Sequence, residues 1–402
     1  MRKKSLIFLA SCALTLAACS YNPFNEFTGI EFSFSGTGGL EVSQCLDKLV
    51  WANNDKCSFY EIYVESSSTS SSKSSSKSSS SKSAEQLPYK TVYDCGFTYD
   101  SSLLNKKIKI VGCTYDENLE KKIVCKSNTI TLPTSLPSFE INSAAKLTIN
   151  QSTVSKHQQS VSGIVNVASS ITYLEIGNFN DALLSFDFAS RPDGSVVRIK
   201  MTDSKFHSHD DGVQPAFNYM GTNKNVSFIF MLNGENSVTG SNSTTYKYAA
   251  SDGLKLPNVY FYGGDGSLTI NGGSCSSFSS SYENNNAGYA VSANKMVNCL
   301  GSAAIRLIGG NGGTGIKYTR GGHGQMPIKE GVKVLATYSS SIGLQAGNGG
   351  QGGYGAYGGN AYAYSYLVDV AYKNYKKSFY KIKEASPGPG GTSGGTGSYI
   401  TK

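Results

Sequence analysis

The sequence predicts an all-β protein whose larger part is a right-handed parallel β-helix, a solenoid of stacked coils. Composition is the first indication, because 45 glycines, 26 tyrosines and 16% charged residues are typical of β-structure with many tight turns. The second is a repeat of 37 residues that relates Leu268, Ile305 and Ile342. Units of a few short strands at such a period are typical of solenoids. A Greek-key β-sandwich is the alternative.

The N-terminal stretch MRKKSLIFLASCALTLAACS has the pattern of a lipoprotein signal. Three basic residues precede an apolar run, Leu6 to Leu16, that is too short to span a bilayer. The letters LAAC, Leu16 to Cys19, resemble the lipobox of bacterial lipoproteins. That resemblance implies removal of residues 1–18 and a lipid on Cys19, which would be the link to the membrane. Ser20 gives no acidic inner-membrane retention signal, so we expect an envelope protein of the outer membrane or cell surface.

Residues 19–128 are predicted to form a small, cysteine-rich β region. A low-complexity tract of serine and lysine at 66–83 interrupts it. The tract contains no apolar side chain that could offset the entropy of ordering, so we expect a solvated tether or loop.

Seven cysteines remain beyond Cys12 and Cys19, and none lies in a Cys-x-x-Cys motif, so zinc-type spacing is absent. Outside the cytoplasm such residues are usually disulfide-bonded. Two pairs of cysteines have equal sequence spacing, which favours two local disulfide loops and leaves Cys95 outside them. Other pairings are open. A third pair could join neighbouring coils. The three predicted pairs are Cys45–Cys57, Cys113–Cys125 and Cys275–Cys299.

Residues 129–402 are predicted to hold the repeats. Each unit reads as two short strands, a turn, a third strand and a glycine-rich loop, and the doublet Gly272-Gly273 recurs as Gly309-Gly310.

Three segments of these repeats carry a resemblance to a known family. They are LNGENSVTG from Leu232, GGDGSLTINGG from Gly263 and IRLIGGNGGTG from Ile305. Their progression resembles surface-displayed β-helix proteins of the "carbohydrate-binding domain-containing" family. The resemblance implies a right-handed β-helix on the cell exterior that binds acidic polysaccharide, sometimes with calcium.

The candidate carbohydrate site lies in the tyrosine- and lysine-rich stretch from Ala361 to Lys383. Alternate tyrosines of a strand share one face, where their rings could stack on sugars, and the lysines that follow could pair with acidic groups. The alternative is that the tyrosines only cap the solenoid. The candidate residues are Tyr362, Tyr364, Tyr366, Tyr372, Lys373, Lys376 and Lys377.

The stretch HSHDD, His207 to Asp211, is the candidate metal site. Its carboxylates Asp210 and Asp211 are oxygen ligands of the kind that Ca²⁺ prefers. The alternative is a solvated turn, and no other cofactor is expected.

A β-helix can also carry polysaccharide lyase or hydrolase activity. The segments HDDG from His209, GHG from Gly322 and RIK from Arg198 superficially resemble a hydrolase set. Their order is wrong, however, and the repeat explains the first two as turns. We therefore expect no catalytic residues.

Nucleotide and nucleic acid are not expected partners. The glycine-rich loops lack the Gly-Lys-Ser/Thr ending and the helix of a phosphate-binding loop. Loss of the signal would lower the formal net charge of +8 by three, to +5, which does not indicate nucleic-acid binding. The expected function is binding of acidic polysaccharide without catalysis. The alternatives are a structural or adhesive surface protein that contacts another protein or cell, and a polysaccharide lyase or hydrolase.

Overall fold

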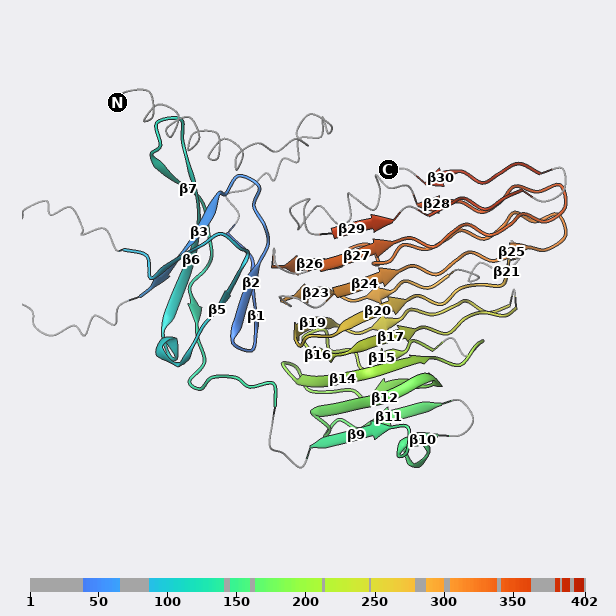
Figure 1. Cartoon of the computed structure of the whole chain (residues 1–402), viewed down its shortest axis with the longest axis horizontal. Helices are drawn as coiled ribbons and strands as arrows, with labels where there is room; N and C mark the ends of the chain where they lie inside the picture. Colours follow the sequence, from blue (N-terminus) through green and yellow to red (C-terminus); the bar gives the residue numbers. More distant parts are fainter. Residues whose placement is uncertain are drawn as a thin grey trace, which may run out of the picture. The chain divides into compact units, whose positions relative to one another are not determined.

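The computed structural model describes residues 39–65, 87–140, 145–159, 163–211, 214–245, 247–278, 287–299, 304–337, 341–362, 380–383, 385–390 and 394–400. All of them belong to one compact unit, Gly39–Lys402. Strands dominate this unit, and the described residues include two short 3₁₀ turns, η1 (Ser101–Leu103) and η2 (Val154–Lys156), but no α-helix. Among these residues, no helix has the length and apolar character needed to cross a bilayer. The predicted all-β class is confirmed (Figure 1).

The first part of the chain forms two small antiparallel sheets. One contains β1 (Val42–Cys45), β2 (Lys48–Trp51) and β5 (Gly96–Thr98). The other contains β3 (Phe59–Val64), β4 (Lys90–Val92), β6 (Lys107–Tyr115), β7 (Lys121–Lys126) and β8 (Ile130–Thr131). Trp51, Tyr60 and Ile62 are among the buried residues of their common core, which also contains Leu132. The small β region therefore continues a few residues past its predicted end at 128.

Two larger sheets follow, and almost all their strands are parallel. A six-stranded sheet contains β10 (Gln158–Gln159), β11 (Ile164–Val167), β13 (Ser185–Phe188), β15 (Phe217–Tyr219), β18 (Leu254–Lys255) and β22 (Val291–Ser292), in that order, and β10 alone is antiparallel.

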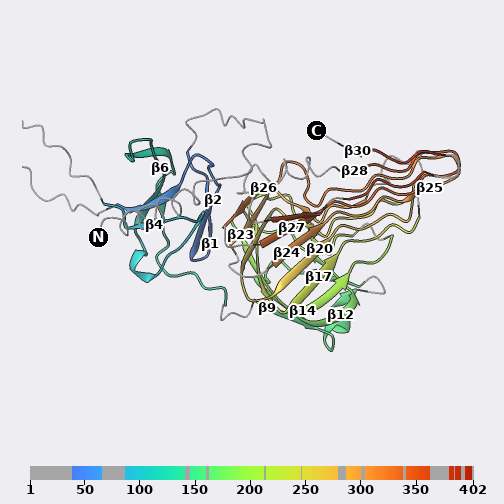
Figure 2. The ribbon, with the colours of Figure 1, turned by 45° about the horizontal axis from the view of Figure 1, so that its top comes forward.

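The twelve-stranded sheet is parallel throughout. Its strands are β9 (Lys146–Asn150), β12 (Tyr173–Leu183), β14 (Val196–His207), β16 (Ser227–Asn233), β17 (Glu235–Thr239), β19 (Asn258–Gly263), β20 (Ser267–Asn271), β23 (Lys295–Asn298), β24 (Ala304–Ile308), β26 (Lys333–Ala336), β27 (Ser341–Gln345) and β29 (Tyr380–Lys383). The long strand β14 pairs with β16 through its first half and with β17 through its second half. The sheet consequently curls like a half-barrel (Figure 2).

The chain alternates between these two sheets, and each strand pairs with its counterpart in the next repeat. Leu268 pairs with Ile305 and Ile305 with Ile342, so the register predicted from the repeat is confirmed. Because the paired residues occupy the same position in successive repeats, their apolar side chains stack in a column that runs from one repeat to the next.

Phenylalanines fill the space inside the curled sheet. Phe217 is fully buried, and its ring stacks on that of Phe186 at 5.2 Å between centroids. Phe230 lies edge-on to Phe217 at 5.5 Å. These rings belong to one core that runs from Ile149 to Leu344. Alternation along each strand places such residues inside.

Apolar side chains also lie on the outer side of the curled sheet. Ile229, Tyr260 and Val297 occur in one buried cluster with Leu46 and Val50 of the N-terminal strands. The Tyr262 hydroxyl donates a hydrogen bond to Asp47 at 2.8 Å, and Lys48 Nζ donates to the Tyr262 carbonyl at 3.2 Å. The cluster explains why strands of the curled sheet are apolar on both faces.

The glycine-rich segments, which the sequence predicts to be loops, are extended segments stacked in layers. The amides of Gly309, Gly312 and Gly315 donate to the carbonyls of Gln345, Asn348 and Gln351, each at 2.7–2.9 Å. Bonding at every third residue matches the threefold repeat of a polyproline II-type strand. These segments run alongside β21 (Ser277–Phe278), β25 (Thr314–Gly315), β28 (Ala361–Tyr362) and β30 (Tyr399–Ile400) (Figure 1).

Glycine permits this layering because the backbones touch. A methyl group on Gly310 would overlap the Gly273 carbonyl oxygen, and one on Gly347 would overlap the Gly310 carbonyl oxygen. Between the glycines, side-chain amides link the layers: the Asn311 Oδ1 accepts from the Asn348 amide at 2.8 Å, and the Asn348 Oδ1 accepts from the Ser386 amide at 2.8 Å.

His323 belongs to a second ladder of this kind, which should make the layer sensitive to acid. Its Nδ1 accepts from the Asn360 amide at 2.8 Å. Desolvation, and then the nearby charge of Arg320, lower the pKa of His323, although its side chain is exposed. A folded-state pKa below the unfolded one stabilises the fold above the unfolded pKa of about 6.5, and this contribution is lost as the pH falls through the lowered folded-state pKa.

We therefore expect the melting temperature to fall between pH 7.5 and pH 5, and the fall to be smaller in His323→Asn. Asparagine keeps an acceptor, as Asn360 does for the Ser398 amide in the next layer, but it does not titrate. His209→Asn, at an exposed turn, is the control and should keep the wild-type pH dependence. An unchanged pH dependence in His323→Asn would contradict this role.

Candidate functional site

Most of the predicted carbohydrate-binding residues lie outside the described residues. They are Tyr364, Tyr366, Tyr372, Lys373, Lys376 and Lys377. Tyr362 lies in β28, which pairs in parallel with β30. Cys19 also lies outside the described part, within Met1–Gly38.

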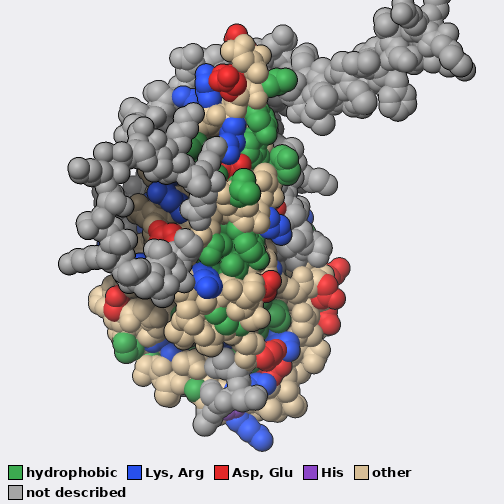
Figure 3. All heavy atoms as spheres, turned by 90° about the vertical axis from the view of Figure 1, so that its left-hand side faces the viewer, with side chains coloured by type: hydrophobic (Ala, Val, Ile, Leu, Met, Phe, Trp, Pro, Cys, Tyr) green, Lys and Arg blue, Asp and Glu red, His purple; other side chains and the backbone are tan. Residues whose placement is uncertain are grey.

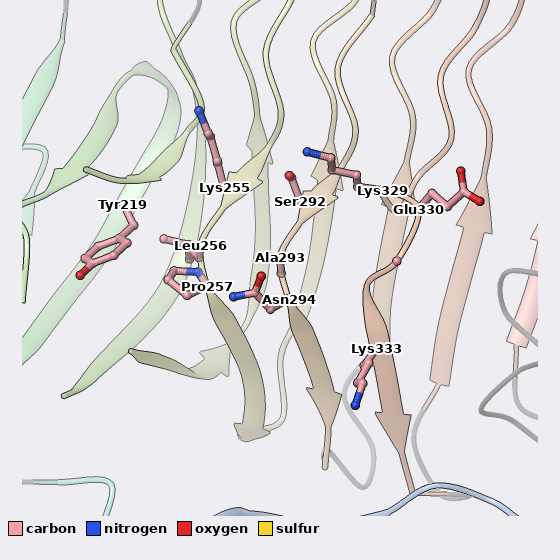
Figure 4. Close-up of a pocket in the computed structure, with 11 residues that line it drawn as sticks. Tyr219, Lys255, Leu256, Pro257, Ser292, Ala293, Asn294, Lys329, Glu330 and Lys333 are labelled. Atoms are coloured by element: carbon pink, nitrogen blue, oxygen red, sulfur yellow. The ribbon is translucent and has the colours of Figure 1, made fainter. Parts of the chain in front are cut away.

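The structure shows another candidate, an open groove of about 430 Å³. It lies where the chain passes from the six-stranded sheet to the twelve-stranded sheet in successive repeats (Figure 4). Lys255, Ser292 and Lys329 line it, together with Asn294 and Lys333. We call these five residues the lysine groove.

Three of these residues occupy one position in three successive repeats. Lys255 pairs with Ser292 in the register of β18 and β22. Val291 then bridges to Ile328, which places Lys329 beside Ser292 in the next repeat. Neighbouring strands lie about 4.8 Å apart, so Lys255 and Lys329 rise from backbones that are roughly 10 Å apart. Figure 4 shows the three side chains in a row along the groove.

Lys333 belongs to a second row. It pairs with Lys295 in the register of β23 and β26, and its Nζ forms a salt bridge with Glu41 at 3.1 Å. Lys255 and Lys329 form no salt bridge with any described residue. These two ammonium groups are exposed and are therefore the cations that a ligand can reach.

Two carboxyl groups belong to the surroundings of the groove. Glu330 lines it and is exposed. Asp252 is half-buried. Burial raises the pKa of its carboxyl group, while the charges of Lys329 and Lys255 act in the opposite direction. The Asp252 carboxylate accepts a hydrogen bond from the Tyr289 amide at 2.9 Å, so it is engaged by the backbone.

The groove offers point charges with hydrogen-bonding groups between them. An ammonium group on a flexible stem pairs with carboxylate, sulfate or phosphate from several directions. Ser292 and Asn294 add a hydroxyl and an amide between the lysines, and the Tyr219 side chain lines the groove nearby. On the face in Figure 3, by contrast, the described basic and acidic side chains lie interspersed. An open, repeating row suits a polymer with repeating negative charges.

The aligned repeats contained a signal for this site. Lys255 in LKLP and Lys329 in IKEG occupy the same position of their units.

A second exposed surface gathers tyrosines at the turns of the glycine-rich layer. Tyr318 and Tyr354 are 77% and 60% exposed, and their ring centroids are 5.8 Å apart in an edge-to-face arrangement. Tyr357 is 62% exposed. These three residues, the tyrosine turn, present apolar ring faces to solvent.

The predicted calcium ligands are engaged in a turn. Asp211 accepts hydrogen bonds from the amide and the hydroxyl of Thr244 in the next repeat. Asp210 Oδ1 is buried and has no hydrogen-bond partner among the described residues. No group of three potential metal ligands occurs in the described part of the chain, so the calcium site stays a prediction.

The segments that resembled a hydrolase set have separate structural partners. Arg198 Nε donates to the Ser138 carbonyl at 3.2 Å, and Lys200 pairs with Glu140 at 3.2 Å. His323 accepts from Asn360, and Asp211 binds Thr244. Each contact stabilises a strand or a turn.

The N-terminal cysteines are not arranged in the predicted pairs. Cys45 and Cys57 pack in different hydrophobic clusters. Gly112, and not Cys113, lies opposite Cys125 in the ladder of β6 and β7, while Cys113 packs in a cluster of its own with Phe59. The faces on which side chains lie, and not the sequence spacing, decide which thiols meet.

The third predicted pair is also separated. Cys299 packs in the cluster that contains Cys45, and its thiol donates to the Phe261 carbonyl at 3.0 Å. Cys275 lies outside that cluster and bridges to Ser243. Cys45, Cys57, Cys113, Cys125 and Cys299 are free thiols in the structure.

No family model, curated protein or solved structure matches this chain.

Proposed function

We propose that this chain is a lipid-anchored cell-surface protein whose right-handed β-helix binds an acidic polysaccharide without catalysis. The observation that carries the proposal is the row of Lys255, Ser292 and Lys329, in which two cations that form no salt bridge with a described carboxylate occupy one position of the repeats. A linear polyanion carries its charges at regular intervals, so a regular row of cations can bind it at several points at once.

The β-helix is supported by the way the chain alternates between sheets. Parallel pairing continues from β11 to β22 in one sheet and through all strands of the other, and paired residues are one repeat apart. Parallel strands joined in this order bury one continuous core, as solenoid coils do.

The surface location is supported by the sequence pattern around Cys19. The signal-like N-terminus and the lipobox letters LAAC would place a lipid at the start of the mature chain, and two or more acyl chains suffice for stable anchoring. Mass spectrometry of the purified protein tests this directly, because lipidated Cys19 is heavier than the unmodified residue.

Replacing both cations should weaken binding to polygalacturonate. The middle repeat carries serine at this position, so Lys255→Ser with Lys329→Ser copies a residue that the fold already accommodates. Each exposed ion pair contributes about 0.2–1 kcal/mol, so we expect the double variant to raise Kd roughly two- to thirtyfold. Affinity electrophoresis or calorimetry measures the change.

The matched control removes two exposed lysines elsewhere, one in the 3₁₀ turn η2 and one in β14. Lys156→Ser with Lys205→Ser changes the net charge equally and leaves the lysine groove intact. Equal Kd values for the two double variants would contradict a role of the groove, and an absorbance rise from unsaturated products would favour the lyase alternative.

The tyrosine turn favours a second candidate function, adhesion to another protein or cell. Exposed tyrosine rings supply contact area with few rotatable bonds. If adhesion is the function, Tyr318→Ala with Tyr354→Ala should abolish attachment of protein-coated beads to cells and leave polygalacturonate binding unchanged. Attachment that persists in this variant would exclude the tyrosine turn as the adhesive surface.

A further inference from the structure

Two cysteines distant in sequence meet in the N-terminal β region. Cys57, just before β3, and Cys125, in β7, have Sγ atoms 3.6 Å apart although 68 positions separate them. The sheet order β3-β6-β7 places β6 between them, so the two side chains must meet across its backbone.

Gly112 of β6 leaves the space in which they meet. A Cβ atom on Gly112 would lie 2.6 Å from both Sγ atoms, so any other residue would separate the two sulfurs. Cys57 is buried and Cys125 packs against the same core. Rotation of either side chain into this space can close the remaining distance to the 2.0–2.1 Å of a disulfide bond.

The two thiols differ in acidity. A hydrogen bond with Cys57 and one from the Gly112 amide lower the pKa of Cys125 to about 7. The same hydrogen bond, together with burial, raises the pKa of the Cys57 thiol. Cys125 is therefore the more acidic of the two thiols, and the thiolate is the reactive form.

We propose that Cys57 and Cys125 form a disulfide bond, in place of the local pairs that the sequence spacing predicts. The oxidant is a disulfide, R–S–S–R, of a small molecule or a thiol oxidoreductase. The Cys125 thiolate attacks one of its sulfurs and expels a thiolate, which leaves Cys125 in a mixed disulfide. Cys57 loses its proton and attacks the Cys125 sulfur, and the second thiolate leaves. The oxidant gains two electrons, and the two protein thiols lose two electrons and two protons.

The neighbouring cysteines do not offer an equivalent partner. Cys113 lies on the other face of β6, where its thiol donates to Glu61 at 3.6 Å; burial and Glu61 raise its pKa to about 11. Cys95 lies deeper, with its Sγ atom 3.9 Å from the Tyr60 hydroxyl. Cys113 is thus a matched control, a cysteine of the same sheet that the bond does not use.

The bond would close a loop that contains the serine- and lysine-rich tract at 66–83. Cross-linking the ends of a long loop restricts the unfolded chain and stabilises the fold. It would also hold the lipid-bearing end and the rest of the chain together if the tract were cut. This inference is independent of polysaccharide binding.

Peptide mapping of the full chain tests the bond. The protein is incubated with oxidised glutathione, blocked with an alkylating agent, and digested with trypsin without reductant. We expect the fragment Cys57–Lys73 to appear joined to Ile123–Lys126, and to separate on reduction. Cys57→Ser and Cys125→Ser should each abolish the joined species, whereas Cys113→Ser should keep it.

The wild-type chain alone decides the outcome if a variant fails to fold. Reduction of the oxidised wild-type protein should lower its melting temperature. Recovery of Cys57 and Cys125 in alkylated form after oxidation, or of Cys57 joined to the fragment that contains Cys45, would overturn the proposal.

Discussion

Replacing Gly347 with alanine should unfold the glycine-rich layer. The added methyl group would overlap the Gly310 carbonyl oxygen in the neighbouring repeat, and the backbones would have to move apart. Their separation breaks hydrogen bonds such as that from the Gly347 amide to the Gln325 carbonyl. We expect a loss of about 3 kcal/mol or more, the upper range for overpacking. Thermal unfolding and hydrogen exchange measure it.

Gly343→Ala is the matched control, four positions earlier in the same repeat. A Cβ atom there would meet only the Arg306 side chain, at an ordinary contact distance of 3.5 Å. That variant should stay within about 0.5 kcal/mol of the wild type. If both variants were equally stable, the close approach of the layers would be wrong.

Phe217→Ala should destabilise the core strongly. Phe217 is fully buried and contacts the rings of Phe186, Phe206 and Phe230 at 5.2–5.7 Å. Truncating a buried phenylalanine costs about 3–5 kcal/mol through lost burial and the cavity that remains. Urea denaturation should show the change as a lower midpoint.

Met220→Ala provides the comparison for Phe217→Ala. Its side chain is 63% exposed and close to Phe217 in sequence, so truncation should change the free energy of unfolding by less than about 0.5 kcal/mol. Equal midpoints for the two variants would mean that Phe217 is not in the core.

The repeat made the strand register predictable from the sequence. Apolar residues such as Leu268 and Ile305 recur at the period of one repeat because each must fill the same column of the core. The alternation of apolar residues and the period of the repeat can both be read from the sequence. Local patterns therefore predict the all-β class and the parallel pairing.

The stacking of the glycine-rich layer could not be predicted from local sequence patterns. Two glycines in every three residues, as in GGNGGTG from Gly309, read locally as turns. Their role depends on a contact between repeats, in which the carbonyl of Gly273 lies against Gly310 in the next repeat. The sequence of a single segment does not reveal such a contact.

The cysteine pairing could not be predicted from the sequence for a related reason. The register of β6 and β7 shifts between Gly112 and Cys113, so Cys113 and Cys125 do not face each other. No spacing in the sequence records such an irregularity. The tyrosine- and lysine-rich candidates near the C-terminus stay predictions, because all but Tyr362 lie outside the described residues.

The binding proposal depends on charge, so a change in the ligand tests it most directly. Titration calorimetry should compare polygalacturonate with the same polymer after reduction of its carboxyl groups to hydroxymethyl groups. Chain length and ring structure are then equal, and the carboxylates that Lys255 and Lys329 would pair with are gone. We predict binding of the native polymer that weakens with added salt, and a loss of roughly two- to thirtyfold in affinity for the reduced polymer. Equal affinity for both polymers, or none for either, would contradict the proposed function.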